Sequence, residues 1–304
     1  MLVEKYKMLK DIEHYSNWKT IKHIDKGWSD DKKFYIEDIK GSRFFLRVAS
    51  ISKYSRKKEE FEMISKMFKS NINMSKPMDF GVCNSRKNCY TLLSWIDGED
   101  AETKIQLFSR EKQFLIGYET GKMVKKIHLT ESIERDLTWS EKYNKKINRI
   151  INDYKNCSIK IPNSKNILKY IEDNRHLLDS RLETIQHGDF HIGNMVIDDD
   201  EKIGIIDFNR CDYGDPWEEF NRLPFSVNAS LDFARGQVDG YFNGKIPDEF
   251  FKLTALYIGV NILSSVPWAI KYGKAEVDFM MNSAKEMLTY YDDFKRYIPS
   301  WYEV

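Results

Sequence analysis

The spacing of hydrophobic residues changes about a third of the way along the chain. In the first ninety-odd residues, short runs rich in β-branched and aromatic residues alternate with polar turns, a pattern typical of strands. Five such runs are predicted to be strands: 21–24, 33–39, 42–49, 78–82 and 90–96. Residues 55–70 carry Phe61, Ile64 and Phe68 at helical spacing, which predicts one helix between the third and fourth strands. The N-terminal part is therefore expected to be a compact α+β unit.

The hydrophobic period becomes helical after residue 97. Residues 109–129 form a strong helix candidate, with Ser109 placed to cap the first turn. Residues 141–156 and 164–183 are also predicted to be helices, residues 184–206 are expected to be extended, and the chain is mostly helical from Trp217 onward. A chain of 304 residues is long enough for two domains. We expect one part to span residues 1–96 and the other residues 97–304.

Composition excludes several classes of protein. Hydrophobic residues make up 41% of the chain and aromatic residues 14%, which supports a folded core. The net charge of +1 gives no general attraction to nucleic acid or to a membrane surface, so neither is expected as a partner. The longest apolar stretch, 253–270, contains polar residues and a proline, and we expect a buried helix there rather than a membrane span.

The cysteines and the N-terminus bear on location. The four cysteines form no metal-binding spacing and no dense disulfide framework, so they are expected to be reduced and at least partly buried. The first residues lack the apolar segment of a signal peptide. We expect a cytoplasmic protein.

One segment carries most of the chemical information. Residues 187–194 read HGDFHIGN, and residues 205–209 read IIDFN. Phosphoryl transfer needs a carboxylate within reach of the attacking hydroxyl, together with oxygen ligands for Mg²⁺. Since Mg²⁺ keeps several water molecules, Asp189, Asn194 and Asp207 are sufficient for both tasks. Their spacing is the same as in the protein-kinase pattern H-R-D-x-x-x-x-N followed by D-F-G, and it predicts phosphotransfer.

Two other interpretations of this segment are possible. His187, Asp189 and His191 alternate, so on a strand they would share one face and could ligate a transition metal, as in metallohydrolases. Asp189 could also simply cap a turn. Gly188 and Gly193 favour a loop, which breaks the alternation, and we prefer the phosphotransfer interpretation.

HGDFHIGN followed by IIDFNRCDYGDPWEEF closely resembles the signature of the aminoglycoside phosphotransferase/choline kinase superfamily, H-G-D-x-x-x-x-N, then I-D-[WF], then G-D-P. The resemblance implies a bilobal protein-kinase-like fold of the α+β class. A small antiparallel N-terminal lobe, residues 1–96, would bind nucleotide, and a mainly helical lobe, residues 97–304, would bind substrate and carry catalysis. It implies that Asp189 is the catalytic base and that Asn194 and Asp207 bind magnesium. The acidic residue of the family's D-L-A segment is replaced by Glu219, whose role is left open.

The N-terminal part offers nucleotide-binding residues in the order that the resemblance implies. Arg47 stands where protein kinases have the strand lysine that contacts the α- and β-phosphates, and a guanidinium can bind phosphate bidentately. Its expected carboxylate partner is Glu60, with Glu59 and Glu62 as alternatives. A loop over the phosphates and the backbone of a hinge strand would hold the rest of the ATP or GTP, and the candidate residues there are Gly27, Ser29, Ser94, Trp95 and Ile96.

The acceptor is less constrained. Acidic residues outnumber basic ones from Gly188 to the end, whereas the preceding part is basic overall, which suits a polyanion in one part and a cation in the other. Two solvated surfaces of opposite bias would give the same counts. The tentative acceptor-binding acids are Asp212, Asp215, Glu218 and Glu219, which would hold a polycation through charge-assisted hydrogen bonds. Aromatic residues in the same region could instead surround a quaternary ammonium group or line an apolar pocket.

Three functional hypotheses follow. The first is an antibiotic-type kinase with an aminoglycoside acceptor. The second is a metabolic kinase acting on choline, an amino alcohol or a sugar-like metabolite. The third, a non-catalytic nucleotide-binding module, is disfavoured because the base, the asparagine and the metal-binding aspartate are all present.

Overall fold

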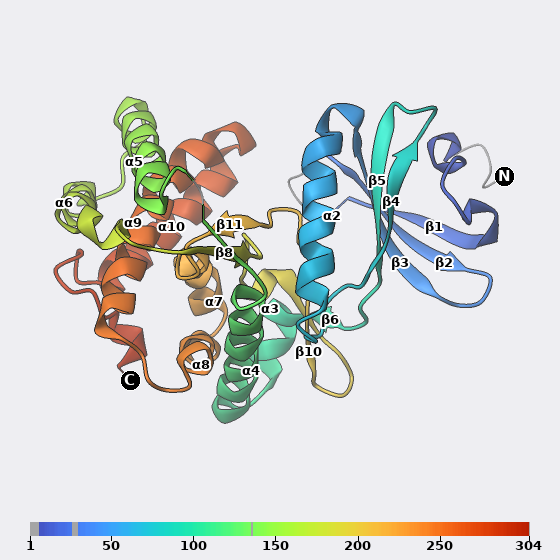
Figure 1. Cartoon of the computed structure of the whole chain (residues 1–304). Coiled ribbons are helices and arrows are strands. Elements are labelled where there is room, and N and C mark those ends of the chain that lie inside the picture. Colours follow the sequence, from blue (N-terminus) through green and yellow to red (C-terminus); the bar gives the residue numbers. More distant parts are fainter. Residues whose placement is uncertain (1–5, 26–29, 135, 304) are drawn as a thin grey trace. The chain divides into compact units, whose positions relative to one another are not determined.

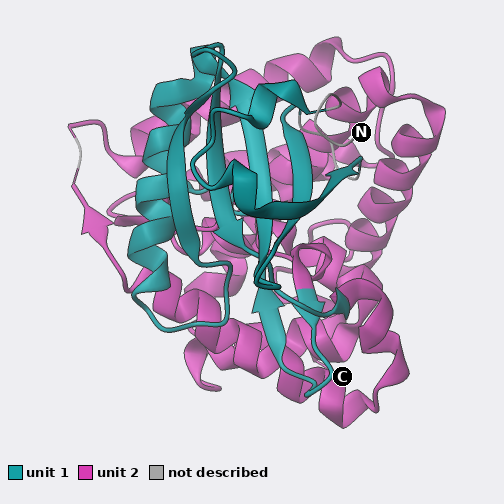
Figure 2. Cartoon of the chain, turned by 90° about the vertical axis from the view of Figure 1, so that its right-hand side faces the viewer, with its two compact units in different colours: residues 1–99, 196–212 teal, residues 100–195, 213–304 magenta. Residues whose placement is uncertain are grey.

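The chain divides into two compact units. The computed structural model describes residues 6–25, 30–134 and 136–303 (Figure 1). Unit 1 comprises residues 1–99 and 196–212, and unit 2 comprises residues 100–195 and 213–304 (Figure 2). The predicted division after residue 96 lies close to the first of these boundaries. Residues 196–212, which include Asp207, were assigned to the second part from the sequence but belong to unit 1. The roles of the two parts in binding and catalysis stay predictions.

Unit 1 is built on a five-stranded antiparallel sheet. The strand order is β1-β2-β3-β5-β4, with bounds β1 Trp18–Ile24, β2 Lys32–Asp38, β3 Arg43–Ser50, β4 Pro77–Cys83 and β5 Asn88–Ser94. The helix α2 (Tyr54–Phe68) runs alongside the sheet in Figure 1, and Phe61 on the helix stacks on Phe80 of β4. Three short 3₁₀ turns complete the segment: η1 Lys7–Leu9, η2 Tyr15–Asn17 and η3 Ile51–Lys53. All five predicted strands and the predicted helix are confirmed, with ends shifted by a few residues.

Strand periodicity divides the residues of this sheet between two faces. Side chains alternate along a strand, so every second residue of β2 and β3 points to the same side. Phe34, Ile36, Leu46 and Val48 form one hydrophobic core together with η1. The intervening residues, which include Arg47, lie on the opposite face. The sheet therefore has one apolar face and one face that can carry charged groups.

Unit 2 is mainly helical, as predicted. Its helices are α3 Ala101–Lys104, α4 Arg110–His128, α5 Trp139–Asn156, α6 Ser164–Asn174, α7 Leu223–Ala229, α8 Leu231–Phe242, α9 Asp248–Ala269 and α10 Lys274–Tyr290. Its 3₁₀ turns are η4 Ile105–Leu107, η5 Arg175–Leu178, η6 Ile192–Asn194, η7 Glu218–Arg222, η8 Ile270–Tyr272 and η9 Ser300–Tyr302. Short strands of unit 2 form most of a small sheet of order β11-β8-β7 (Asp212–Gly214, Glu183–Gln186, Ser132–Ile133). A second small sheet, of order β10-β9-β6 (Ile203–Ile205, Met195–Ile197, Glu99–Asp100), belongs mostly to unit 1.

The apolar stretch predicted to be a buried helix lies in α9. Most residues of α9 are buried, as expected for a core helix. Within the described residues, the segment Asp248–Tyr272 is long and apolar enough to cross a membrane, but 67% of its apolar window is buried inside the protein. The cysteines are also as predicted, because Cys83, Cys89, Cys157 and Cys211 are all free and buried.

Two predicted helix boundaries were wrong. The helix predicted over 164–183 ends at Asn174, with η5 behind it and β8 beginning at Glu183. Helical structure does not resume after η5, because Ser180 has a left-handed φ of 58°. The helix predicted from residue 141 begins two residues earlier, at Trp139, because Thr138 and Glu141 form a reciprocal capping box that the sequence T-W-S-E already contains.

Helices α4 and α8 pack unusually closely through glycines. A Cβ atom at Gly121 of α4 would stand 2.2 Å from the carbonyl oxygen of Gln237, and one at Gly240 of α8 would stand 2.0 Å from that of Tyr118. No side chain larger than hydrogen fits at such distances. This packing matters for function because it sets His128, at the end of α4, against Tyr241 of α8.

Candidate active site

The segment HGDFHIGN forms a loop between β8 and β9, and its backbone is held by one buried carboxylate. Glu219, which is 2% exposed, accepts hydrogen bonds from the backbone N–H groups of His187 (2.7 Å), Gly188 (2.9 Å) and Phe190 (3.3 Å). Gly188 has a φ of 82°, which favours glycine. Glu219 therefore shapes the loop from inside the protein. Its tentative assignment as an acceptor-binding acid was wrong, because both carboxylate oxygens are already engaged.

A buried polar chain supports Glu219 from behind. His128 is 4% exposed, and its Nε2 lies 3.6 Å from a Glu219 carboxylate oxygen. The other ring nitrogen, Nδ1, lies 2.9 Å from the Tyr241 hydroxyl. Burial, with smaller contributions from nearby carboxylates, raises the pKa of Tyr241 far above its usual value, so the hydroxyl keeps its proton. The close packing of α4 against α8 thus places Tyr241 beside His128, which in turn lies beside the loop-binding carboxylate of Glu219.

Asp189 lies on this loop with its side chain 17% exposed. Its backbone N–H donates to Nδ1 of His187 at 3.2 Å, and its carbonyl oxygen accepts from Nδ2 of Asn194 at 2.8 Å. The carboxylate Oδ1 is 3.0 Å from Nε of Arg222 and 3.9 Å from Nε2 of His191. A partly exposed carboxylate, fixed on both its backbone and its side chain, has the geometry of a general base that must meet a substrate hydroxyl.

Arg222 is a residue that the sequence reasoning missed. It ends η7, the same turn that carries Glu219, and its Nη1 donates to Oδ1 of Asn261 on α9 at 3.1 Å. Residues three apart on a helical turn face the same side. Glu219 and Arg222 are three residues apart in η7, so both face the loop. This spacing is visible in the sequence, but the orientation of Glu219 is not.

Arg47 and Asp207 meet within unit 1. Nη2 of Arg47 donates to Oδ1 of Asp207 at 2.6 Å, although the two residues are far apart in the chain. Asp207 follows β10 with a left-handed φ of 64°, and its side chain is 39% exposed. Non-glycine residues adopt this conformation rarely, and they do so preferentially at functional sites. The Arg47 side chain is only 7% exposed, so this ion pair is shielded from water on the arginine side.

Glu60 does not pair with Arg47, so that prediction was wrong. Glu60 instead accepts from Lys57 at 2.8 Å and lies 3.2 Å from Nε of Arg56. Both partners lie one turn before it on α2, where helical spacing brings them together without any help from the rest of the fold. Glu59 and Glu62, the alternatives, are exposed.

Asp31 is a second residue that sequence reasoning missed. It stands just before β2, is 7% exposed, and its carboxylate lies 3.0 Å from Lys53, 3.1 Å from Lys57 and 3.7 Å from Arg47. Burial by itself would raise the pKa of Asp31, but the two ammonium groups outweigh burial and hold the pKa below its usual value. Asp31 is thus the anion around which the cations of unit 1 gather.

Comparison with known proteins identifies the family. Residues 20–250 match the model of a family described as the phosphotransferase enzyme family. The chain belongs to the phosphotransferase enzyme family. It is an enzyme that transfers phosphate to a hydroxyl group. No curated protein sequence matches the chain closely enough to count as a relative.

Solved structures of low sequence identity show the same fold as this phosphotransferase. A choline/ethanolamine kinase family protein from Mesorhizobium loti is 13% identical, with 100% of each chain covered and a TM-score of 0.68. A thermostable mutant of the aminoglycoside phosphotransferase APH(4)-Ia, in a ternary complex with ADP and hygromycin B, is 15% identical over 94% of this chain and 97% of its own, with a TM-score of 0.66. A spectinomycin phosphotransferase bound to ADP and spectinomycin is 14% identical over 89% of each chain, with a TM-score of 0.57. The predicted protein-kinase-like fold is confirmed.

Two groups of predicted nucleotide-binding residues stay predictions. Gly27 and Ser29 lie outside the described residues. In the hinge segment, the N–H of Ser94 donates to the Lys76 carbonyl and that of Trp95 to the Arg43 carbonyl, so both are used within the sheet. A nucleotide base in this phosphotransferase would have to use the other backbone groups of the segment, which runs to Ile96.

Most of the tentative acceptor-binding acids are engaged within the phosphotransferase itself. Asp215 has no exposed surface and binds Arg181 through two hydrogen bonds. Glu218 is 8% exposed and accepts from Lys146 at 2.8 Å. These two assignments were wrong because a carboxylate that is buried and paired cannot hold a polycation as well. Asp212 differs in exposure, since its side chain is 51% exposed, and its Oδ1 lies 3.9 Å from Nη1 of Arg56.

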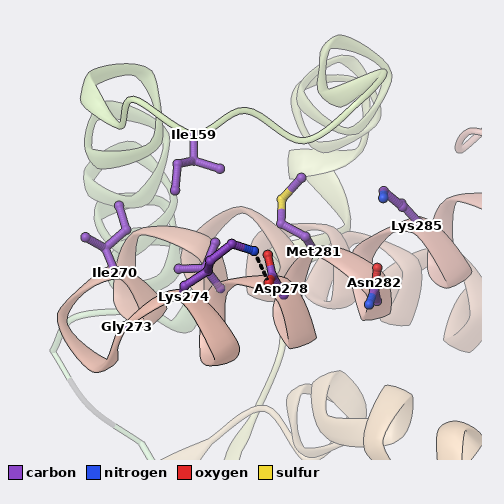
Figure 3. A pocket seen from close by; sticks show the side chains of 9 residues that line it. Ile159, Ile270, Gly273, Lys274, Asp278, Met281, Asn282 and Lys285 are labelled. Atoms are coloured by element: carbon purple, nitrogen blue, oxygen red, sulfur yellow. Dashed lines mark hydrogen bonds and ion pairs between the residues drawn. The ribbon is translucent and has the colours of Figure 1, made fainter.

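One cavity of unit 2, of about 700 Å³, lies beside α10 (Figure 3). Its lining combines apolar side chains with a few charged ones: Ile159, Ile270, Gly273, Lys274, Val277, Asp278, Met281, Asn282 and Lys285. Figure 3 shows that the acid of this lining, Asp278, is joined to Lys274. None of the predicted site residues that the structure describes lines the cavity, so it gives no support to an acidic subsite for a polycationic acceptor.

The metallohydrolase interpretation fails on geometry. Among the residues with described positions, no three His, Cys, Asp or Glu side chains converge on a point that could hold a metal ion. His187 has no exposed surface and uses its Nδ1 to accept the Asp189 N–H. Mg²⁺ makes a weaker demand, because it arrives with nucleotide phosphates and needs only one or two protein oxygens.

Proposed function

We propose that this phosphotransferase moves the γ-phosphate of ATP or GTP to a hydroxyl of a small, cationic acceptor. The observation that carries the proposal is the state of Asp189, a partly exposed carboxylate on a loop whose backbone is held by Glu219 and whose side chain is oriented by Arg222. Phosphoryl transfer depends mainly on positioning and on charge stabilisation. A carboxylate held in this way can accept the hydroxyl proton as the oxygen attacks phosphorus.

The remaining residues of the proposed machinery bind the donor. Arg47 would contact the phosphates through its planar guanidinium while its other edge stays on Asp207. Asp207 and Asn194 would each offer one oxygen to Mg²⁺. Asp207 has a second carboxylate oxygen beyond the one that Arg47 binds. Asn194 donates from its Nδ2 to the Asp189 carbonyl, so its Oδ1 is the atom that it would offer. When bound, Mg²⁺ would neutralise charge on the transferring phosphate.

For the acceptor, an aminoglycoside-type antibiotic is the first candidate, and an antibiotic-resistance role would follow from it. Support comes from the acidic excess after Gly188 and from the likeness in fold to proteins solved with hygromycin B and spectinomycin. The support is limited by the engagement of Asp215, Glu218 and Glu219, which leaves Asp212 as the exposed acid of the predicted set.

A metabolic kinase for choline, an amino alcohol or a sugar-like metabolite is the second candidate, and one feature of unit 2 favours it. His191 of the catalytic loop packs on Phe225 of α7 with ring centroids 4.8 Å apart, and Phe225 stacks on Phe279 of α10 at 6.5 Å. Phe279 is 47% exposed. An aromatic row that begins beside Asp189 suits a small ammonium group, which aromatic faces attract.

The proposed site of action is the cytoplasm, where nucleoside triphosphates are supplied, and neither nucleic acid nor a membrane is a proposed partner. This part of the proposal rests on the near-neutral charge and on the burial of α9.

An acceptor panel tests the proposal. Purified protein is incubated with Mg²⁺ and either ATP or GTP, with aminoglycosides, choline, ethanolamine and simple sugars offered one at a time. Acceptor-dependent release of nucleoside diphosphate, absent in Asp189→Asn, is the expected result. Release that persists unchanged in Asp189→Asn would remove Asp189 from the mechanism, and the acceptor that responds decides between the two candidates.

A further inference from the structure

The register of the N-terminal sheet sets a lysine directly opposite Arg47. Lys33 of β2 is the cross-strand partner of Arg47 on β3, with the pair Phe34 and Leu46 next to it on the apolar face. Lys33 is 9% exposed and Arg47 is 6% exposed. Two cations thus lie side by side on the same, non-core face of the sheet, and both are largely shielded from water.

This arrangement is costly for the protein alone. Like charges directly opposite each other on neighbouring strands are destabilising. Burial, reinforced by the positive charge of Arg47, lowers the pKa of Lys33, although Asp207 and Asp31 act in the other direction. Around Asp31 the same cluster also holds Lys53 and Lys57. The cations Lys33, Arg47, Lys53 and Lys57 thus share the carboxylates of Asp31, Glu60 and Asp207.

A second, independent observation points to a ligand. Nη1 of Arg47 is buried and makes no hydrogen bond to the part of the protein that the structure describes, and its nearest acid, Asp31, is 3.7 Å away. A buried guanidinium nitrogen without a hydrogen bond carries a desolvation cost that an anionic oxygen would remove. Phosphate oxygens of the donor nucleotide are the anions that the proposed reaction brings to this residue.

We propose that Lys33 and Arg47 act as a pair that binds neighbouring phosphate groups of the donor nucleotide, so that β2 as well as β3 supplies a phosphate-binding cation. The inference rests on the proposed function, since it concerns the phosphates of the same donor. Arg47 offers a planar guanidinium that can bind one phosphate group bidentately, and Lys33 offers a compact ammonium charge to a neighbouring phosphate group. A triphosphate gains from both cations, whereas a monophosphate can engage only one.

The neighbouring lysine provides a matched control. Lys32 precedes Lys33 on β2, is exposed, and points to the other face of the sheet, where its Nζ lies 3.7 Å from Sδ of Met8. Lys33→Ala and Lys32→Ala remove the same charge from adjacent positions. With a non-hydrolysable ATP analogue, we expect Lys33→Ala to weaken binding about tenfold, the loss of one charge-assisted contact, and Lys32→Ala to change it by less than about twofold.

Two measurements distinguish a phosphate-binding role of Lys33 from a structural one: the affinity for nucleotides with different numbers of phosphates, and the melting temperature. The loss in Lys33→Ala should be largest for the triphosphate analogue and small for the monophosphate, and Lys33→Arg should recover part of it. The positive charge of Arg47 and the carboxylates of Asp207 and Asp31 act on Lys33 in opposite directions, so the melting temperature of Lys33→Ala should stay close to that of the wild type. A lower melting temperature together with an equal loss for all three nucleotides would overturn the inference in favour of a structural role.

Chemical labelling tests the wild-type protein without any substitution. An ATP analogue with an acyl group on its terminal phosphate acylates nearby amines: the neutral amine attacks the acyl carbonyl, the bond to phosphate breaks, the nucleotide leaves and the amine proton passes to solvent. Lys33 should be labelled and excess ATP should protect it, whereas absence of label on Lys33 would contradict the inference. If instead the wild type binds no nucleotide at all, the proposed function fails, and that result differs from normal binding by both lysine variants, which would refute the Lys33 assignment alone.

Discussion

The charged cluster of unit 1, formed by Lys33, Arg47, Lys53 and Lys57 beside Asp31, differs in construction from the HGDFHIGN loop of unit 2. In unit 1, Lys33 and Arg47 are cross-strand partners, and Lys53 and Lys57 lie beside Asp31. In unit 2, the loop is held by backbone hydrogen bonds to the buried carboxylate of Glu219. We propose that the grouped cations of the first region bind an anion, whereas the second region is held in shape by hydrogen bonds within unit 2. Substitutions in unit 1 should therefore affect the KM for nucleotide, and those on the loop should affect kcat.

The largest effect is expected at Asp189. Asp189→Asn should lower kcat by about 10²–10⁴-fold, the usual contribution of a general base, while the Kd for nucleotide stays nearly unchanged because no donor contact is lost. Kinetics with the best acceptor and equilibrium binding of a non-hydrolysable nucleotide check this. Should Asp189→Asn lose nucleotide affinity while Arg47→Ala keeps it, the two regions would have exchanged roles.

Asp207 should show the next largest effect, and it should disturb both parameters. Asp207→Asn removes the full negative charge offered to Mg²⁺ and also the carboxylate that holds Arg47 at 2.6 Å. We expect turnover to fall on the order of 10²-fold and the Mg²⁺ concentration for half-maximal rate to rise. Asn194→Ala, which removes an amide dipole and the hydrogen bond to the Asp189 carbonyl but no charge, is the comparison and should have the smaller effect. Wild-type turnover of Asp207→Asn at limiting Mg²⁺ would refute the assignment.

Arg222, which lies in η7 beside the Asp189 carboxylate, tests whether positioning of Asp189 affects kcat alone. Arg222→Gln removes the cation 3.0 Å from the Asp189 carboxylate, so kcat should fall about tenfold with little change in the KM for nucleotide. Arg222→Lys keeps the charge and should recover part of the loss. Arg110→Gln breaks the surface ion pair with Asp232 and serves as the control. A rise in the KM for nucleotide with unchanged kcat would mean that Arg222 contacts the donor instead of positioning Asp189.

The sequence was informative where structure depends on local spacing. Strand alternation and helical periodicity are local properties, so the order of elements in unit 1 and the long helices of unit 2 could be predicted. The motif spacing also singled out Asp189, Asn194 and Asp207, whose roles stay predictions. Partners of charged residues could not be predicted in the same way, because several carboxylates compete for each cation and the winner depends on distances set by the whole fold.

Three residues illustrate that limit. Glu60 pairs with Arg56 and Lys57, which lie one turn away on its own helix, and not with Arg47. Glu219 belongs to an acidic run that looks like an exposed subsite, yet the turn buries it beneath the catalytic loop. Lys33 is one of two adjacent lysines, and only the register of β2 against β3 distinguishes it from Lys32. In each case composition indicates a charged surface, and packing decides which charges face the site.

The smallest expected effect concerns the stability contributed by Asp31. Its pKa lies below the usual value in the folded protein because Lys53 and Lys57 outweigh the cost of burial. A carboxyl with a depressed pKa stabilises the fold above its unfolded-state pKa, near 4, and this contribution is lost as the pH falls through the folded-state value. Desolvation offsets much of the attraction, so we expect a contribution on the order of 1 kcal/mol. Melting temperatures between pH 3 and 7 should fall less steeply in Asp31→Asn than in the wild type. Asp200→Asn, which removes an exposed carboxylate beside Lys202, should keep the wild-type slope. Equal slopes for all three proteins would mean that Asp31 does not anchor the cations of unit 1.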